Sequence, residues 1–148
     1  MSAIRALSAS ARRFRKPVGV ASTALAVAAC VSAEVPYRPL APGEQVYRQV
    51  CMACHATGVE NAPRLGDRQA WKPLVDEGQD TLTAHAWVGV RGMPARGGQP
   101  GLSLEEFARA TAYMARAAGG DWQDPDADML AEIEEEIAER LASLTQGK

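Results

Sequence analysis

The sequence predicts an all-α fold with about four short helices and a longer amphipathic helix at the C-terminus. Apolar residues recur at spacings of three and four, capping residues bracket several segments, and no segment shows the alternation of a β-strand. The chain has 148 residues, which is enough for one domain with extensions. We expect four segments, at residues 1–29, 30–42, 43–120 and 121–148.

Residues 1–29 have the pattern of a lipoprotein-type signal peptide. Five basic residues precede an apolar run of 12, residues 18–29, which is shorter than the roughly 20 residues that cross a bilayer. The run ends in Val-Ala-Ala-Cys30, which resembles the lipobox of bacterial lipoproteins. We therefore expect lipidation at Cys30 and a periplasmic protein anchored to a membrane. Cleavage after Ala33 is the alternative, and it would release a soluble periplasmic protein.

The rest of the chain is acidic, and its charge is unevenly distributed. Residues 30–42 contain three prolines and are expected to form an extended tether. Residues 35–120 carry a net charge of +1, whereas residues 121–148 carry −7. A near-neutral domain with an acidic tail argues against nucleic acid as a partner.

Local signals place the helices of the central region. The expected elements are a helix from Gly43 into a cysteine motif, helices at 68–75 and 81–88, a loop at 89–101 and a helix at 103–118. Val46 and Val50 share one face of the first helix. Ser103 and Glu106 have the spacing of a capping box, and Gly119–Gly120 end that last helix.

The tail is expected to form one more helix. Asp124 and Pro125 have the residue types of an N-cap and first helical position, and the helix is expected to end near Leu144. Its apolar stripe consists of Leu130, Ile133, Ile137, Leu141 and Leu144. We favour packing of this stripe against the central domain. A coiled-coil or complex partner is the alternative.

The central domain has few large side chains for its core. Only eight of the 148 residues are aromatic, and a domain of about 80 residues is marginal without additional support. A buried prosthetic group would supply that support.

The stretch Cys51–His55, CMACH, has three possible uses. A thioredoxin-type redox pair follows a strand in a βαβ unit, and the sequence contains no strand signal. A structural zinc site takes four ligands, and downstream only His85 is a further strong candidate. C-x-x-C-H is the attachment signature of c-type haem, which is attached outside the cytoplasm. Together with the export signal, the CMACH motif predicts one haem c that is covalently bound through Cys51 and Cys54, with His55 as an axial ligand.

A second axial ligand would have to come from elsewhere in the chain. The candidates are His85, Met52, Met93, Met114 and Met129. Met52 lies inside the motif, and the settings of Met114 and Met129 indicate core packing. Met93 lies in a glycine-rich loop with Pro94 after it, so we favour Met93. His85 and an open iron site remain alternatives.

From Gly43 to about Ala115 the chain resembles the class I c-type cytochromes, specifically the cytochrome c5 type. The matching stretches are GEQVYRQVCMACHATGVENAPRLGD, Trp71, GMPARGG and LSLEEFARATAYM. The resemblance implies short helices around one haem c, with the first and last core helices crossing. It also implies His55 and Met93 as axial ligands, and a bond from His55 Nδ1–H to the carbonyl of Pro63.

Two features depart from the cytochrome c5 pattern. Many relatives carry a second cysteine pair after the GG, whereas Gln99 and Leu102 stand at those positions here. The acidic helix after Gly120 has no counterpart in the minimal domain.

The expected function is single-electron transfer by a monomeric carrier that is not an enzyme. A haem with both axial positions filled exchanges electrons and does not readily bind a substrate. The expected partners are redox proteins, such as a dehydrogenase, a quinol–cytochrome reductase or a terminal oxidase. Arg64, Arg91 and Arg96 are a candidate docking patch, or else propionate partners or solvated charges. The alternatives are a fixed cytochrome subunit of a membrane-associated oxidoreductase and a haem-based ligand sensor with a labile Met93.

Overall fold

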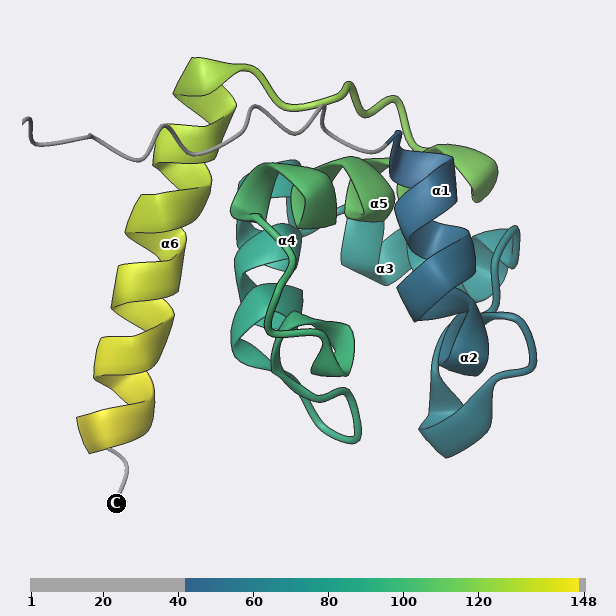
Figure 1. Cartoon of the computed structure of the whole chain (residues 1–148), viewed down its shortest axis with the longest axis horizontal. Coiled ribbons are helices and arrows are strands. Elements are labelled where there is room, and N and C mark those ends of the chain that lie inside the picture. The colour runs from purple at the N-terminus through teal and green to yellow at the C-terminus, as the bar shows by residue number, and fades with distance from the viewer. Residues whose placement is uncertain (1–41, 147–148) are drawn as a thin grey trace, which may run out of the picture. The chain divides into compact units, whose positions relative to one another are not determined.

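The computed structural model describes residues 42–146, all within one compact unit. The signal peptide, Cys30 and residues 30–41 of the tether lie outside this range, so those predictions stay predictions. The elements are α1 Gly43–Val46, η1 Tyr47–Cys51, α2 Met52–His55, η2 Val59–Asn61, α3 Arg68–Val75, α4 Gln79–Val88, η3 Ala95–Gly98, α5 Leu104–Ala117 and α6 Ala127–Gln146 (Figure 1). Within this range the backbone contains an isolated bridge between Val90 and Met93 but no strand, so the all-α prediction is confirmed.

The first and last core helices cross at close range. α1, η1 and α2 run without a break from Gly43 to His55, and α1 packs against α5. A Cβ atom on Gly43 would overlap the backbone carbonyl of Arg109, so only glycine allows this approach. The rings of Tyr47 and Tyr113 meet beside the crossing, with centroids 5.6 Å apart. This crossing is the arrangement that the resemblance implies.

α5 is the central helix of the core. Its buried residues include four alanines and the larger Phe107 and Met114. Small side chains let neighbouring helices approach closely, while the larger ones fill the space between them. Trp71 of α3 and Leu82 of α4 belong to the same buried cluster.

Both ends of α5 form as the sequence predicts. Ser103 and Glu106 form a reciprocal capping box at its start. At its end Gly119 has a φ of +98°, and the N–H of Gly120 donates to the carbonyl of Ala115 at 2.9 Å. A left-handed residue followed by this back-bond is the usual glycine stop of a helix.

The predicted start of α6 is wrong by two residues. The helix begins at Ala127, and Asp126, not Asp124, accepts the N–H of Met129 at 2.9 Å. The carboxylate of Asp124 instead accepts a hydrogen bond from Arg116 at 3.0 Å. This partner lies eight residues away in the chain, so helix-capping rules could not reveal it.

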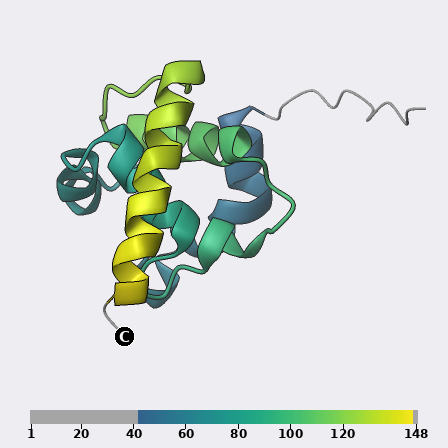
Figure 2. The same cartoon turned by 90° about the vertical axis from the view of Figure 1, so that its left-hand side faces the viewer.

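α6 packs along α4 in the two orthogonal views (Figures 1 and 2). Ile133 is fully buried, Leu130 and Ile137 are partly buried, and Leu141 and Leu144 are exposed by 50% and 45%. The interpretation that the tail packs back on the domain is therefore confirmed for Leu130, Ile133 and Ile137, but not for Leu141 and Leu144. No helix in residues 42–146 has the length and apolar content needed to cross a membrane.

Candidate functional site

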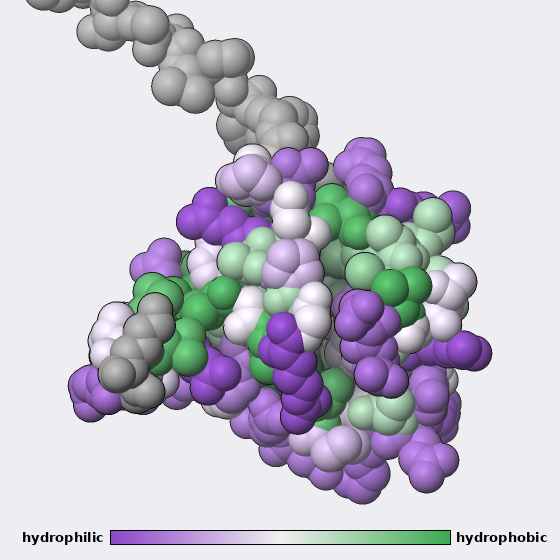
Figure 3. All heavy atoms as spheres, turned by 90° about the horizontal axis from the view of Figure 1, so that it is seen from below, coloured by the Kyte–Doolittle hydropathy of each residue, from purple (hydrophilic) through white to green (hydrophobic). Residues whose placement is uncertain are grey.

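A cavity of about 540 Å³ lies between the helices of the domain. Its walls come from η1–α2, the η2 loop, α3, α4, the loop that carries Met93, and α5, with one residue from α6. The face seen from below in Figure 3 is hollowed near its centre, with apolar residues between polar ones. The volume lies within the roughly 300–1,000 Å³ of small-molecule and cofactor sites.

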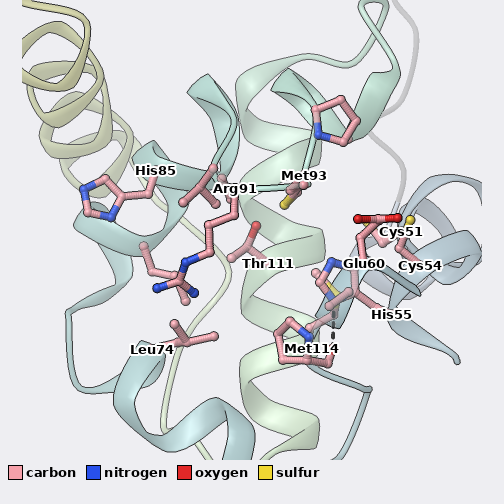
Figure 4. Close-up of a pocket in the computed structure, with 18 of the residues that line it drawn as sticks. Cys51, Cys54, His55, Glu60, Leu74, His85, Arg91, Met93, Thr111 and Met114 are labelled. Atoms are coloured by element: carbon pink, nitrogen blue, oxygen red, sulfur yellow. Dashed lines mark hydrogen bonds between the residues drawn. The ribbon is translucent and has the colours of Figure 1, made fainter. Parts of the chain in front are cut away.

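The two cysteines of CMACH lie on one wall of this cavity as free thiols (Figure 4). Cys51 ends the π-helical turn η1, and Cys54 lies in α2 directly after it. Burial raises the pKa of the Cys51 thiol to about 11, and the neighbouring Cys54 adds to the rise. Redox pairs and zinc ligands need thiolates, whereas a thioether is neutral and its burial carries no such penalty. Burial therefore disfavours the Cys51 thiolate, and a thioether at this position would carry no charge to bury.

His55 is held in a defined orientation. It is 6% exposed, and its Nδ1 lies 2.8 Å from the carbonyl oxygen of Pro63. A carbonyl can only accept, so Nδ1 carries a proton, and in the neutral imidazole Nε2 then keeps its lone pair. The N–H of Leu65 also donates to the carbonyl of His55 at 2.8 Å. Two bonds thus fasten residues 56–65 to His55 and give it the tautomer of a metal ligand.

Trp71 of α3 supports the same loop. Its Nε1–H donates to the carbonyl of Arg64 at 2.8 Å, and its ring centroid lies 6.0 Å from that of His55. Asp67 is the N-cap of α3, and its carboxylate accepts a hydrogen bond from the N–H of Ala70 at 3.1 Å. The helix therefore positions an indole that fixes the histidine loop from behind.

Met93 lies in a tight turn at the edge of the cavity. Its N–H donates to the carbonyl of Val90 at 2.9 Å, and the N–H of Val90 donates back to Met93 at 3.1 Å. Gly89, with a φ of +100°, allows the chain to leave α4 and enter this turn. Figure 4 shows the Met93 side chain among the groups of the cavity. The sequence-predicted loop is therefore ordered by reciprocal backbone bonds.

The other candidate ligands differ in whether they line the cavity. His85 lines the cavity and its Nδ1 lies 3.2 Å from a carboxylate oxygen of Glu77. Met114 is 4% exposed and belongs to the core as predicted, although it also contributes to the cavity wall. Met52 is 46% exposed. Neither Met52 nor Met129 of α6 belongs to the cavity lining.

The three arginines of the candidate docking patch have different surroundings. The guanidinium carbon of Arg96 lies 4.5 Å from the centre of the Trp87 ring, and its Nη1 donates to Pro100. Arg91 lines the cavity, and Arg64 has its side chain beside Gly58. Arg96 therefore stabilises its own loop, and docking by these residues stays a prediction.

Sequence reasoning missed several polar residues of the cavity. Glu60, Thr111 and Arg140 belong to its lining. Glu60 has a φ of 52°, and Thr111 is buried with its hydroxyl donating to the carbonyl of Phe107. Arg140 was detectable in principle, because it is the sole basic residue in the sequence of α6.

Comparisons with known proteins agree with this geometry. A family profile described as cytochrome C oxidase, cbb3-type, subunit III matches residues 38–114, just over half of the chain. Cytochrome c-555 of Chlorobaculum thiosulfatiphilum is 38% identical over 78 residues, covering 50% of this chain and 91% of the relative. The chain belongs to the class I c-type cytochromes.

Further similarities support the same assignment. Cytochrome c5 of Azotobacter vinelandii is 39% identical over 74 residues, covering 49% of this chain and 89% of the relative. A cytochrome c solved in an electron-transfer complex with nitrite reductase has a TM-score of 0.51 and 47% identity, covering 54% of this chain and 99% of that one. The predicted class I cytochrome c fold is thus confirmed.

The residues of the cavity fit the cofactor of this family, one covalently bound haem c. Cys51 and Cys54 present two free thiols on one wall, and the His55 Nε2 lone pair is free of the bond that Nδ1 makes. Thioether attachment uses both thiols, and an imidazole of this tautomer suits iron. Haem c, when bound, supplies an iron that exchanges one electron between ferric and ferrous states. The chain is therefore a haem-based electron-transfer protein.

Proposed function

We propose that this cytochrome is a monohaem electron carrier in which His55 and Met93 are the two axial ligands. The observation that carries the proposal is the ordered turn at residues 90–93, which holds the Met93 side chain at the cavity. Methionine sulfur is a soft ligand that favours ferrous iron. With both ligands supplied by the chain, neither oxygen nor a substrate has an open position, which suits a carrier.

The protein groups around the site keep the ligands in place during electron transfer. Pro63 holds His55 through Nδ1, and the reciprocal bonds between Val90 and Met93 hold the loop on the other side. Ligands fixed by such bonds move little when the iron changes its charge. Phe107 and Met114 are buried residues of α5, and they keep water from the wall of the cavity that α5 forms. Both effects favour fast single-electron exchange.

Replacement of each candidate ligand tests the proposal. Met93→Ala should abolish the near-infrared sulfur–iron charge-transfer band of the ferric protein and allow the reduced protein to bind carbon monoxide. His85→Ala and Met114→Leu should keep the band, because neither residue is a ligand in this proposal. A band that survives in Met93→Ala but is lost in Met114→Leu would assign the ligand to Met114. Absence of the band in the unmodified holoprotein, with His85→Ala gaining carbon monoxide binding, would assign it to His85.

We further propose a periplasmic location with a lipid anchor at Cys30. The basic segment, the apolar run and the Val-Ala-Ala-Cys30 sequence support this proposal. Expression of the full chain and of Cys30→Ser, followed by separation of membrane and soluble fractions, tests it. The unmodified chain should enter the membrane fraction with the added mass of a lipid, and Cys30→Ser should not. Equal partition of both would contradict the anchor.

The proposed partners are redox proteins, such as a dehydrogenase, a quinol–cytochrome reductase or a terminal oxidase. The similarity to a cytochrome c solved with nitrite reductase supports partners of this general kind. The profile description, a subunit of an oxidase, favours a second candidate function as a fixed subunit of an oxidoreductase complex. Detergent extraction and purification from the native membrane distinguish the two, since a free carrier is recovered alone and a subunit is recovered with its complex.

A further inference from the structure

The C-terminal helix contributes a residue to the cavity, although it lies outside the matched cytochrome domain. The family match ends at residue 114, whereas α6 spans Ala127–Gln146. Arg140 of α6 is nevertheless part of the cavity lining. A segment added to the domain thus supplies a cation to the site where the haem is bound.

Arg140 does not use the ion pair that its own helix offers. Glu136 precedes it by four residues, the favourable order for a helical pair, yet no ion pair joins them in the described structure. Glu44 and Arg48 have the same spacing and do pair, at 2.7 Å. Among the described residues the Nε of Arg140 is buried without a hydrogen-bond partner. A buried donor left unpaired is destabilising, so an anion in the cavity would stabilise this arrangement.

The position of α6 sets which end of the cavity Arg140 reaches. α6 packs along α4, which carries His85. Figure 4 shows His85 beside the α6 ribbon, on the side of the cavity opposite to Cys51 and Cys54. The vinyl groups that form the thioethers lie on one edge of a haem, and its two propionates lie on the opposite edge. The anchored cysteines therefore direct the propionates toward the end where α6 lies.

Two cations that can bind a carboxylate, Arg91 and Arg140, line the cavity. The carboxylate of Glu77, which also lines the cavity, lies 3.2 Å from Nδ1 of His85. A guanidinium binds a carboxylate through two parallel N–H···O bonds, which a partly buried site strengthens. Arg91 comes from the cytochrome domain itself, and Arg140 comes from the extension.

We propose that Arg140 binds a haem propionate, so that the C-terminal helix forms part of the haem site. The proposal rests on the covalent haem but not on Met93 as a ligand. The helix thus closes the propionate end of the cavity and adds a positive charge near the iron. Such a charge favours the ferrous form, because reduction removes one positive charge from the haem.

Resonance Raman spectra and reduction potentials of full-length holoprotein variants test the proposal. In Arg140→Gln the propionate bending bands should shift to lower frequency, because a hydrogen bond to the propionate is lost, and the reduction potential should fall. Lys72→Gln is the matched control, since it removes one positive charge from an exposed site on α3. It should leave the propionate bands unchanged and move the potential less.

Arg140→Lys keeps the charge without the two-pronged bond, so its bands and potential should lie between those of the unmodified protein and Arg140→Gln. Should Arg140→Gln fail to fold, a band shift in Arg140→Lys alone still supports the proposal. Propionate bands equal to those of the unmodified protein in either variant would overturn it, as would equal effects of Arg140→Gln and Lys72→Gln. The near-infrared band, recorded on the same samples, reports separately on Met93, so the two proposals fail independently.

Discussion

Truncation of Ile133 to alanine tests whether docking of α6 contributes to the stability of the cytochrome domain. Ile133 is fully buried, and α6 packs along α4. The substitution removes three carbons, each worth about 0.8 kcal/mol when buried, or about 2.4 kcal/mol in all. The cavity left behind adds to this, so a loss of about 3 kcal/mol in the free energy of unfolding is expected.

Leu141→Ala is a control on the same helix, because its side chain is 50% exposed. It should cost no more than about 1 kcal/mol. Thermal and denaturant unfolding of both holoproteins, followed by far-ultraviolet circular dichroism, measures the difference. For a domain of this size, Ile133→Ala should lower the Tm by about 10 °C or more. Equal Tm values for the two variants would show that the α6–α4 contact contributes little, and would refute the reasoning from burial.

Two further substitutions test the close crossing of the helices and the start of α6. Gly43→Ala should lower the free energy of unfolding of the holoprotein by about 1–3 kcal/mol, because the added methyl group overlaps an α5 carbonyl. Gly101→Ala is the control. A Cβ atom at this position has no atom nearer than 3.8 Å, so the substitution should have little effect on the Tm. Asp126→Ala should cost about 1 kcal/mol by removing the N-cap of α6, and Asp124→Ala, which loses an exposed ion pair, should cost about 0–1 kcal/mol in the same denaturant titration. A larger loss of stability in Asp124→Ala than in Asp126→Ala would instead support Asp124 as the N-cap, as the sequence predicts.

Local signals predicted most helices closely. α3 has the bounds Arg68–Val75 that the sequence predicts, and α4 begins at Gln79, two residues before the expected start. The capping box of Ser103 and the glycine stop of α5 also form. Each of these features depends on residues within about one helical turn, so the sequence contains the information needed to place them.

The sequence by itself determined the chemistry of the site, because CMACH brings both thiols and the imidazole of His55 together within five residues. Tertiary structure alone decided where the long-range partners lie. It assigned Asp124 to Arg116 and left Asp126 to cap α6. It also placed Arg140 at the cavity, although Arg140 lies more than 80 residues after CMACH in the sequence. Helical spacing determines which residues of α6 share a face, but the partner of that face depends on packing against α4.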